Sequence, residues 1–388
     1  MRIIETTAAL EALTAELKTA PYIALDTEFM RDTTYWPKLC LLQIATKGVE
    51  AIVDPLAEGI DLSSFFTLLK MRKIVKVLHA ARQDIEIFWN LGHAIPDPLF
   101  DTQIAAMVCG FGEAASYETL ARKLAEVQLD KSARFTDWSR RPLTERQLSY
   151  AIADVTHLRV IYEKLAERLK RTGRDAWVAE EIHALQDKNL YTLDPVDAWR
   201  RLKPRSNNKR FLAMMAAVAA WREREAQSRD TPRGRVLKDE AILEISASPP
   251  TSAEELERIR SVPRGFAASR MGKSLLETVA ESKNAPPPAM DGLAKPKRRK
   301  GAPSAASVDL LKTLLRMNAE KAEVAPHLIA DSDEIERIAV GETDGVPALA
   351  GWRADVFGKD ARALLQGKIA LTIENGDSAV VELDDPEP

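Results

Sequence analysis

The stretch Tyr22-Ile23-Ala24-Leu25-Asp26-Thr27-Glu28-Phe29 is an apolar run with two acidic residues near its end. Its composition predicts a buried β-strand. Since side chains alternate between the faces of a strand, Asp26 and Glu28 should share one face, with Leu25, Thr27 and Phe29 on the other. Two neighbouring carboxylates repel each other and lose hydration when buried, which costs stability unless a cation lies between them. Because an isolated Asp-x-Glu is more often an exposed strand end, the interpretation depends on the rest of the chain.

Length and composition describe an ordinary globular protein. The chain has 388 residues, of which 45% are hydrophobic and 29% charged, and this length predicts two or three domains. No apolar run approaches the roughly 20 residues that cross a bilayer, and the N-terminus lacks the apolar core of a signal peptide. Cys40 and Cys109 are too few for a disulfide framework. We therefore expect a cytoplasmic monomer that does not associate with membranes.

Charge is unevenly distributed along the chain. Residues 201–300 contain 22 basic and 12 acidic residues, a net charge of +10, whereas residues 301–388 contain 8 basic and 17 acidic residues, a net charge of -9. A basic middle segment indicates a polyanionic partner, although a solvated surface explains the charge equally well.

Hydrophobic periodicity predicts strands first and helices afterwards. A helix over residues 6–20 precedes the acid-bearing strand, and two further strands complete a three-stranded meander. A helix, a strand and a helix stopped by Gly92 follow, and from Phe100 onward the pattern is helical almost throughout. The strands after the first are expected over 38–46, 49–54 and 73–79, and the two helices over 62–71 and 81–91. This order indicates a mixed sheet flanked by helices.

A long helix is expected from Glu145, because Thr144-Glu145-Arg146-Gln147 fits a capping box. Tyr150 and Asp154 lie four residues apart, so they share one face of this helix. Leu148, Ile152 and Val155 form a neighbouring apolar stripe that should pack on the sheet. Asp154 is therefore expected at the boundary between sheet and helix.

The composition changes after Arg200, and Pro204 to Asn208 interrupts the helical pattern. We expect one domain over residues 1–203, a helical domain over 207–284, a flexible basic linker over 285–304 and a second helical domain over 305–388. The linker contains Lys295-Pro296-Lys297-Arg298-Arg299-Lys300, which is either a nucleic-acid tether or a soluble spacer.

Four acids occupy places where a mixed α/β sheet binds ligands. Asp26 and Glu28 end one strand, Asp84 follows another in His79-Ala80-Ala81-Arg82-Gln83-Asp84, and Asp154 lies on the late helix. Carboxylates without a cluster of Cys or His select Mg²⁺ or Mn²⁺ rather than Zn²⁺. Two such ions about 3.5–4 Å apart can clamp the attacking and leaving oxygens of a phosphodiester. Tyr150 could orient the attacking water, because a phenol with an ordinary pKa near 10 is a poor general base at pH 7.

The set Asp26-Thr27-Glu28-Phe29, His79 to Asp84 and Tyr150-Ala151-Ile152-Ala153-Asp154 resembles the three motifs of the DEDD exonuclease superfamily, in its tyrosine-bearing branch. Two intervening stretches, Ser116 to Leu120 and Lys131 to Ser139, narrow the resemblance to ribonuclease D. The middle segment is similar to an HRDC module, the C-terminal module that this family shares with certain helicases, through Trp221-Arg222, Asp230-Thr231-Pro232-Arg233 and Leu237-Lys238-Asp239-Glu240.

This resemblance implies a fold like RNase H followed by two small all-α HRDC-type domains, the second degenerate. It also implies 3′-5′ hydrolysis of RNA, release of nucleoside 5′-monophosphates and maturation of tRNA 3′ ends, with tRNA precursors and single-stranded 3′ ends as partners. Asp26, Glu28 and Asp154 would hold one divalent metal. Asp26 would bridge to a second metal, which Asp84 would contact directly or through water, and Tyr150 would align the nucleophile.

Candidate substrate contacts come from the same motifs and their neighbourhood. Phe29 could stack on a terminal base if the chain turns after the acids, and His79 could approach the scissile phosphate or be a strand-end histidine bonded to its surroundings. Arg134, Arg140 and Arg141 could line a substrate groove or belong to a solvated loop. Of the middle-segment cations, those over residues 200–205 are the candidates for phosphate contact, while Trp199 and Trp221 are expected to pack inside the module.

Two alternatives differ in class from an exoribonuclease. One is a DNA repair or proofreading exonuclease, since two-metal chemistry acts on the phosphate and does not read the 2′-hydroxyl. The other is a catalytically silent RNA-binding module, which the presence of all four acids and Tyr150 disfavours.

Overall fold

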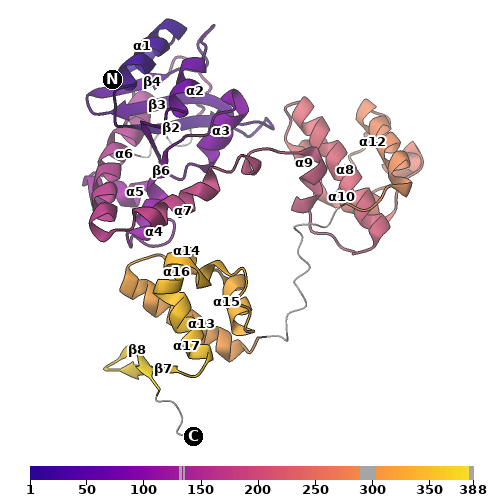
Figure 1. Ribbon diagram of the computed structural model, residues 1–388. Helices are drawn as coiled ribbons and strands as arrows, with labels where there is room; N and C mark the ends of the chain where they lie inside the picture. The colour runs from indigo at the N-terminus through magenta and orange to yellow at the C-terminus, as the bar shows by residue number, and fades with distance from the viewer. Residues whose placement is uncertain (131–132, 134–135, 289–302, 384–388) are drawn as a thin grey trace.

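The computed structural model describes residues 1–130, 133, 136–288 and 303–383. Figure 1 shows three units: a first unit with a central sheet, a middle helical unit, and a C-terminal unit that lies against the helices of the first. Most of the expected basic linker, including all of its Lys295 to Lys300 cluster, lies outside the described residues. Among the described helices, none is long and apolar enough to span a membrane.

The first unit is built on a six-stranded sheet in the order β1-β4-β3-β2-β5-β6. The acid-bearing strand β2 lies inside this sheet, antiparallel to β3 and parallel to β5. The expected meander is confirmed, because β3 also pairs antiparallel with β4. The strands are β1 (Arg2–Ile4), β2 (Tyr22–Met30), β3 (Lys38–Thr46), β4 (Val49–Val53), β5 (Val75–Leu78) and β6 (Leu99–Asp101). The edge strands β1 and β6 were not predicted, because three residues are too few to show a period.

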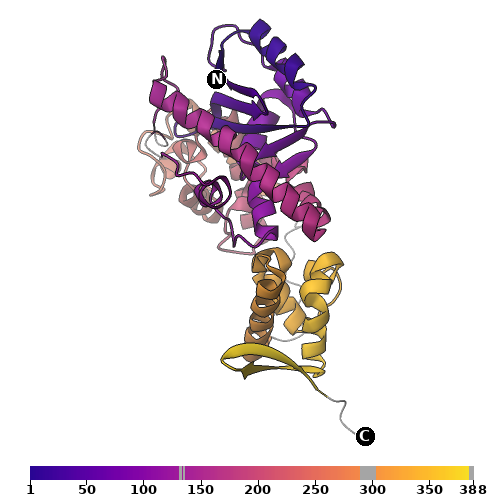
Figure 2. The same ribbon diagram turned by 90° about the vertical axis from the view of Figure 1, so that its left-hand side faces the viewer.

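Helices cover both faces of the sheet. One face packs on α1 (Thr7–Leu17), α2 (Ser63–Leu69) and α3 (Arg82–Gly92) through a core that includes Leu25 of β2. The other face packs on α6 (Glu145–Thr172), where Val155 and Leu158 contact Tyr22 and Ala24. Figure 2 shows α6 running across the strands. The predicted capping box of α6 is present, with Thr144 and Gln147 bonded reciprocally.

The structure at the end of α3 corrects the expected role of Gly92 as the residue that stops the helix. The helix does end there, but the left-handed cap residue is His93, with φ of 44°. A Cβ on Gly92 would lie 2.2 Å from Cγ of Phe66. Gly92 is therefore the residue that lets α3 pack closely on α2, and it does not supply the turn.

The remaining helices of the first unit are short. They are α4 (Thr102–Val108), α5 (Tyr117–Leu120), the π-helical η1 (Ala121–Ala125), α7 (Asp175–Leu185) and the 3-10 turn η2 (Lys188–Leu190). The segment η3 (Pro195–Arg201) then leads into the middle unit, which contains α8 (Lys209–Ser228), α9 (Arg233–Val236), α10 (Asp239–Ala247), α11 (Ala253–Glu257), α12 (Arg270–Glu281) and η4 (Ser282–Asn284).

The middle unit has its own apolar core. Trp221 and Leu275 are among its buried residues, and Trp199 joins them although it precedes the expected boundary at residue 203. Both tryptophans are thus packing residues, as expected. The core of the middle unit begins at η3, before the interruption of the helical pattern at Pro204.

A loop of the first unit inserts into the middle unit. Tyr35, from the loop between β2 and β3, is 3% exposed and packs in the core of the middle unit. Its hydroxyl donates to Glu223 and accepts from Nη2 of Arg233 at 2.8 Å. The backbone N–H groups of Tyr35 and Trp36 both donate to Oδ1 of Asp230, at 3.0 and 2.9 Å. The strand that carries the acids therefore continues into the contact that holds the middle unit.

The C-terminal unit docks on α4, α6 and α7. Trp352 stacks on Trp177 with ring centroids 4.3 Å apart, and Arg353 bonds to Glu180 and Glu181. The backbone N–H of Ala325 donates to the carbonyl of Met107 at 3.0 Å. The unit comprises α13 (Ala305–Ala322), α14 (Pro326–Ile329), α15 (Ser332–Ala339), η5 (Pro347–Leu349), α16 (Gly351–Arg353), η6 (Ala354–Gly358), α17 (Lys359–Leu365), β7 (Ile369–Glu374) and β8 (Asp377–Glu382).

The hairpin β7–β8 corrects the expectation that this last unit is wholly helical. Asn375 and Gly376 connect the two strands with φ of 52° and 92°. Positive φ at both positions is the geometry of a type I′ turn, for which Asn-Gly between alternating runs is a strong signal. The local sequence therefore encodes this hairpin, although helical patterns surround it.

Asp230 provides a test of the loop contact. We expect Asp230→Gly to loosen the middle unit, because it removes the acceptor for two N–H groups while glycine accepts the positive φ of 46° at this position. The cost should be roughly 1–3 kcal/mol, with a larger radius of gyration by small-angle X-ray scattering. Asp230→Asn keeps an acceptor and tolerates this φ, so it should match the wild type. Equal scattering profiles for the glycine variant and the wild type would contradict the contact.

Candidate active site

Three of the four predicted acids meet at one point. Each of Asp26, Glu28 and Asp154 offers a carboxylate oxygen, and these oxygens all lie within 4.8 Å of one another. Strand β2 places the first two on the face covered by α6, as alternation predicted, and α6 brings Asp154 to them. All three side chains are partly exposed. The group therefore has both the carboxylates and the access that a hydrated divalent cation needs.

The electrostatics of the group favour a bound cation. Burial raises the pKa of Asp26 well above its ordinary value, and the neighbouring carboxylates Asp154, Asp84 and Glu28 raise it further. Mutual repulsion of this kind is relieved by a positive charge between the carboxylates. The residues present thus fit a divalent metal ion.

Asp84 lies beside the group but outside that set of three. It sits in the first turn of α3 and is 7% exposed. Its Oδ1 accepts a hydrogen bond of 2.5 Å from Thr27, whose side chain points to the opposite face of β2 from Asp26. Burial raises the pKa of Asp84 to about 7. Asp84 thus bonds to the opposite face of β2 from Asp26, yet lies close enough to help raise the pKa of Asp26.

A cavity of about 290 Å³ opens over the acids. Asp26 and Asp154 line it together with Tyr150, which confirms that Tyr150 and Asp154 share a face of α6. Tyr150 also contacts the ring of Trp138, with centroids 6.0 Å apart. The complete lining is Asp26, His79, Ser116, Tyr117, Glu118, Leu129, Tyr150, Asp154 and Leu158.

The other predicted substrate contacts lie at different places. His79 lines the cavity, its Nδ1 lies 3.0 Å from Oγ1 of Thr102, and burial lowers its pKa. Phe29 follows a shift of register between Glu28 and Phe29 and packs against the main core. Arg140 is exposed and pairs with Asp137 at 3.1 Å. Arg134 falls outside the described residues. Of the candidates that the structure describes, His79 alone lines this cavity.

The guanidinium of Arg141 is used in contacts within the protein. It forms a bidentate ion pair with the buried Asp54, at 2.5 and 2.6 Å, and donates to the carbonyl of Cys40 at 2.8 Å. It ties the segment before α6 to strands β3 and β4, and these contacts leave little of its guanidinium available to a substrate.

Two residues near the acids were not assigned a role from the sequence. The Tyr117 hydroxyl donates to the carbonyl of Asp154, and its ring packs edge-on against His79. Gln43 lies directly opposite Asp26 on β3, is fully buried, and its amide has no partner among the described residues. Tyr117 lies in one of the quoted motifs, whereas the position of Gln43 follows only from the register of the sheet.

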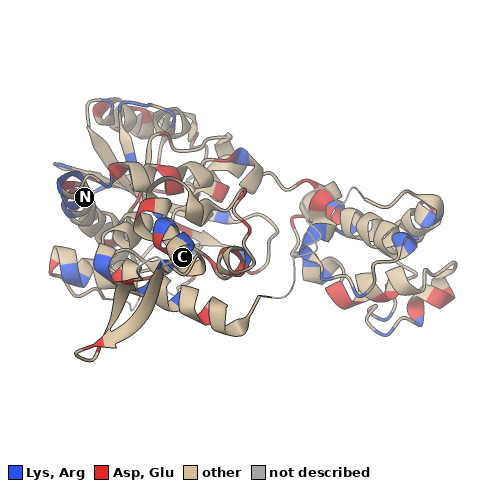
Figure 3. Cartoon of the chain, turned by 60° about the horizontal axis from the view of Figure 1, so that its bottom comes forward, with Lys and Arg blue, Asp and Glu red and all other residues tan. Residues whose placement is uncertain are grey.

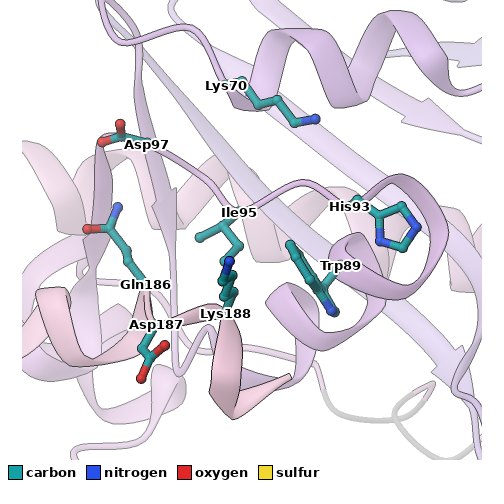
Figure 4. A pocket seen from close by; sticks show the side chains of 8 residues that line it. All are labelled: Lys70, Trp89, His93, Ile95, Asp97, Gln186, Asp187 and Lys188. Atoms are coloured by element: carbon teal, nitrogen blue, oxygen red, sulfur yellow. The ribbon is translucent and has the colours of Figure 1, made fainter. Parts of the chain in front are cut away.

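A second hollow lies at the other end of α3. Its volume is about 470 Å³, and Figure 4 shows Trp89, His93 and Lys70 on one side and Gln186, Asp187 and Lys188 on the other. None of the four predicted acids lines it, and Asp97 at its edge pairs with Arg72 at 3.0 Å. The predicted acids therefore make the smaller cavity the candidate active site.

The fold and site correspond to known families. Residues 1–170 match the 3′-5′ exonuclease family and residues 211–279 match the HRDC domain family. The protein is thus of the class in which an α/β 3′-5′ exonuclease domain is joined to an HRDC domain. The chain is 48% identical over 365 residues to ribonuclease D of Granulibacter bethesdensis, which covers 94% of this chain and 92% of the relative. It is 47% identical to ribonuclease D of Nitrobacter hamburgensis, and this match covers 98% of this chain and 100% of the relative.

A solved structure agrees with this placement. The crystal structure of Escherichia coli RNase D, described as an exoribonuclease involved in structured RNA processing, superposes with a TM-score of 0.78 at 31% identity and covers 94% of this chain and 98% of the other. The chain belongs to the ribonuclease D family and is a 3′-5′ exoribonuclease. The HRDC match covers the middle unit, while a second HRDC copy in the C-terminal unit stays a prediction.

The raised pKa of Asp84 predicts how stability depends on pH without metal. The folded state holds this proton more tightly than the unfolded chain. The contribution of protonated Asp84 to the free energy of unfolding is therefore complete below its ordinary pKa near 4. This contribution is lost as the pH rises toward 7. We expect Asp84→Asn, which can still accept from Thr27, to melt at a higher temperature than the wild type at pH 8 and at the same temperature at pH 4. About 1.4 kcal/mol per pKa unit sets an upper limit on the order of 4 kcal/mol.

The melting temperatures should be measured by calorimetry in EDTA. Asp32→Asn, at an exposed position of the same unit, is the matched control and should show no such pH dependence. An equal increase in the melting temperature of Asp84→Asn at pH 4 and at pH 8 would contradict the raised pKa of Asp84.

Proposed function

We propose that the chain removes nucleotides from RNA 3′ ends, releasing nucleoside 5′-monophosphates with the help of two Mg²⁺ or Mn²⁺ ions, and that tRNA precursors are among its substrates. The observation that supports this most is the convergence of Asp26, Glu28 and Asp154 below a cavity that Tyr150 also lines. The expectation of a cytoplasmic monomer stays a prediction.

The roles of the side chains follow from where they lie. Asp26, Glu28 and Asp154 would hold one ion, and Asp26 would share the second with Asp84, which would contact it directly or through water. Bound divalent ions lower the pKa of water and stabilise the oxygen that leaves the phosphate. Tyr150 would orient the attacking water through its hydroxyl. Tyr117 would steady Asp154 through the backbone carbonyl that it binds.

RNA is favoured over DNA because the most similar relatives reported above are ribonucleases by name. A silent RNA-binding module is disfavoured, since three of the acids converge and two of them, Asp26 and Asp154, line one cavity with Tyr150. Digestion of matched single-stranded RNA, single-stranded DNA and a tRNA with extra 3′ nucleotides separates these possibilities. Preferential release of 5′-monophosphates from the RNA supports the proposal, and preferential cleavage of DNA rejects it.

Metal removal tests the carboxylate site. EDTA should abolish nucleotide release, and Mg²⁺ or Mn²⁺ should restore it. Asp154→Asn should lower activity by at least 100-fold, on the scale expected for loss of a positioned catalytic group, while Glu58→Gln, at an exposed position of the same unit, should have no effect. Full activity in EDTA, or a fully active Asp154→Asn, would rule out metal-dependent catalysis at this site.

Tyr150→Phe tests the water-orienting group. The variant keeps the ring that contacts Trp138 and deletes only the hydroxyl. We expect the single-turnover rate to fall by a factor on the order of 10²–10⁴, with RNA affinity and melting temperature unchanged. Tyr162→Phe, on the same helix but packed against Tyr22 and Phe100, is the control. If both variants cleave at the wild-type rate, Tyr150 is a packing residue.

A further inference from the structure

Gln43 lies directly opposite Asp26 in the antiparallel pair of β2 and β3. Residues opposite each other in such a pair point to the same face of the sheet, with Cβ atoms about 4.5–5.5 Å apart. Gln43 therefore points toward α6, the helix that brings Asp154 to Asp26 and Glu28. It is fully buried and is not among the residues that line the cavity over the acids. The glutamine thus faces Asp26 from the interior of the protein.

The other neighbours of Gln43 on this face of the sheet are apolar. Leu41 and Ala45 lie two residues away on β3, and Ile52 lies opposite on β4. All three are buried, Leu41 and Ile52 in one apolar cluster under α6 and Ala45 in another. A leucine or a methionine would pack in this layer without any polar atom. Packing therefore does not explain why an amide is here.

The Gln43 amide is unpaired in its buried position. Neither its nitrogen nor its oxygen has a hydrogen-bond partner among the described residues. A buried donor or acceptor without a partner lowers stability, and buried amides in folded proteins nearly always have partners. An apolar side chain of the same shape would avoid this cost. The cost is offset if the amide is used when the site binds metal.

Asp26 has the complementary deficiency. Its carboxylate accepts the backbone N–H of Thr27, but no side chain of the described residues donates to it. Figure 3 shows Lys and Arg interspersed with Asp and Glu over the first unit, yet the charges that act most strongly on Asp26 are those of neighbouring carboxylates. A lysine or arginine at this place would compete with the metal ions for Asp26. An amide supplies two N–H donors and adds no charge.

We infer that Gln43 is a positioning residue for metal binding, because its amide donates to the carboxylate of Asp26 and fixes the orientation of that carboxylate toward the cavity. The inference rests on the proposed function, in which both ions share Asp26. A carboxylate that serves two ions has the least freedom to turn, so its orientation matters most. Loss of a hydrogen bond to a metal-binding carboxylate typically lowers metal affinity by about 10–100-fold.

Gln43→Met tests this role, because methionine keeps the length of the side chain and removes the amide. In EDTA the variant should melt at or above the temperature of the wild type, since it loses an unpaired buried amide. Isothermal titration calorimetry should give a Kd for Mn²⁺ that is about 10–100-fold higher in the variant than in the wild type. The single-turnover rate should fall at low Mn²⁺ and recover as Mn²⁺ is raised to saturation.

Thr46→Val is the matched control. Thr46 is another buried polar residue of β3, but its hydroxyl donates to the carbonyl of Tyr22 at 2.8 Å. Loss of this bond should lower the melting temperature, while the Kd for Mn²⁺ stays that of the wild type. The two variants should therefore differ in which quantity changes, the melting temperature or the metal affinity. A purely structural role of Gln43 would not produce this difference.

A wild-type Kd for Mn²⁺ in Gln43→Met overturns the inference. If the methionine variant melts well below the wild type, Gln43→Leu takes its place, and the same comparison of Kd values decides. A rate at saturating Mn²⁺ that stays as low as the rate at low Mn²⁺ also overturns the inference, because a residue that acts through metal affinity is compensated by more metal.

The titration of the wild type separates this inference from the proposed function. If the wild type binds no Mn²⁺ and keeps its activity in EDTA, the proposed metal site fails and the role of Gln43 fails with it. If the wild type binds Mn²⁺ and Gln43→Met binds it equally tightly, only the role of Gln43 fails.

Discussion

The mutual repulsion of Asp26, Glu28 and Asp154 is the constraint on which this structure depends. Their oxygens lie within 4.8 Å of one another, in a place where burial already raises the pKa of Asp26. Free carboxylates would move apart, so the fold must hold them. It does so by placing β2 between β3 and β5 and by packing Val155 and Leu158 of α6 onto the sheet. The site stays assembled because the packing of sheet and helix offsets the repulsion.

The same strand links the chemistry to the rest of the molecule. The chain leaves the acids at Glu28 and reaches Tyr35 seven residues later, where it enters the core of the middle unit. The bond from Tyr35 to Glu223 is buried and the bond from Arg233 to Tyr35 is partly buried, and polar contacts in such surroundings are costly to break. The C-terminal unit instead docks on α4, α6 and α7 through Trp177 and Trp352. Two accessory units thus attach to the catalytic unit through different elements.

Sequence reasoning failed where a residue's role depends on a distant neighbour. Gly92 looks like a helix stop, yet its missing side chain makes room for Phe66. Arg141 looks like a groove cation, yet Asp54, which follows β4 and lies 87 residues earlier in the chain, binds its guanidinium. Gln43 carries no motif, and only the register of β3 puts it opposite Asp26. The Asn375-Gly376 hairpin differs from these cases, because the signal for its turn is local.

The sequence by itself determined the features that arise from short-range geometry. Alternation on a strand put Asp26 and Glu28 on one face, the four-residue spacing put Tyr150 and Asp154 on one face of α6, and Thr144 with Gln147 began that helix. The order of these motifs along the chain was also sufficient to identify the family. The tertiary structure alone decided that Asp84 bonds to Thr27 and that Asp54 pairs with Arg141. Local patterns repeat every two or four residues and can be read along the chain, whereas contacts between distant segments depend on how whole elements pack.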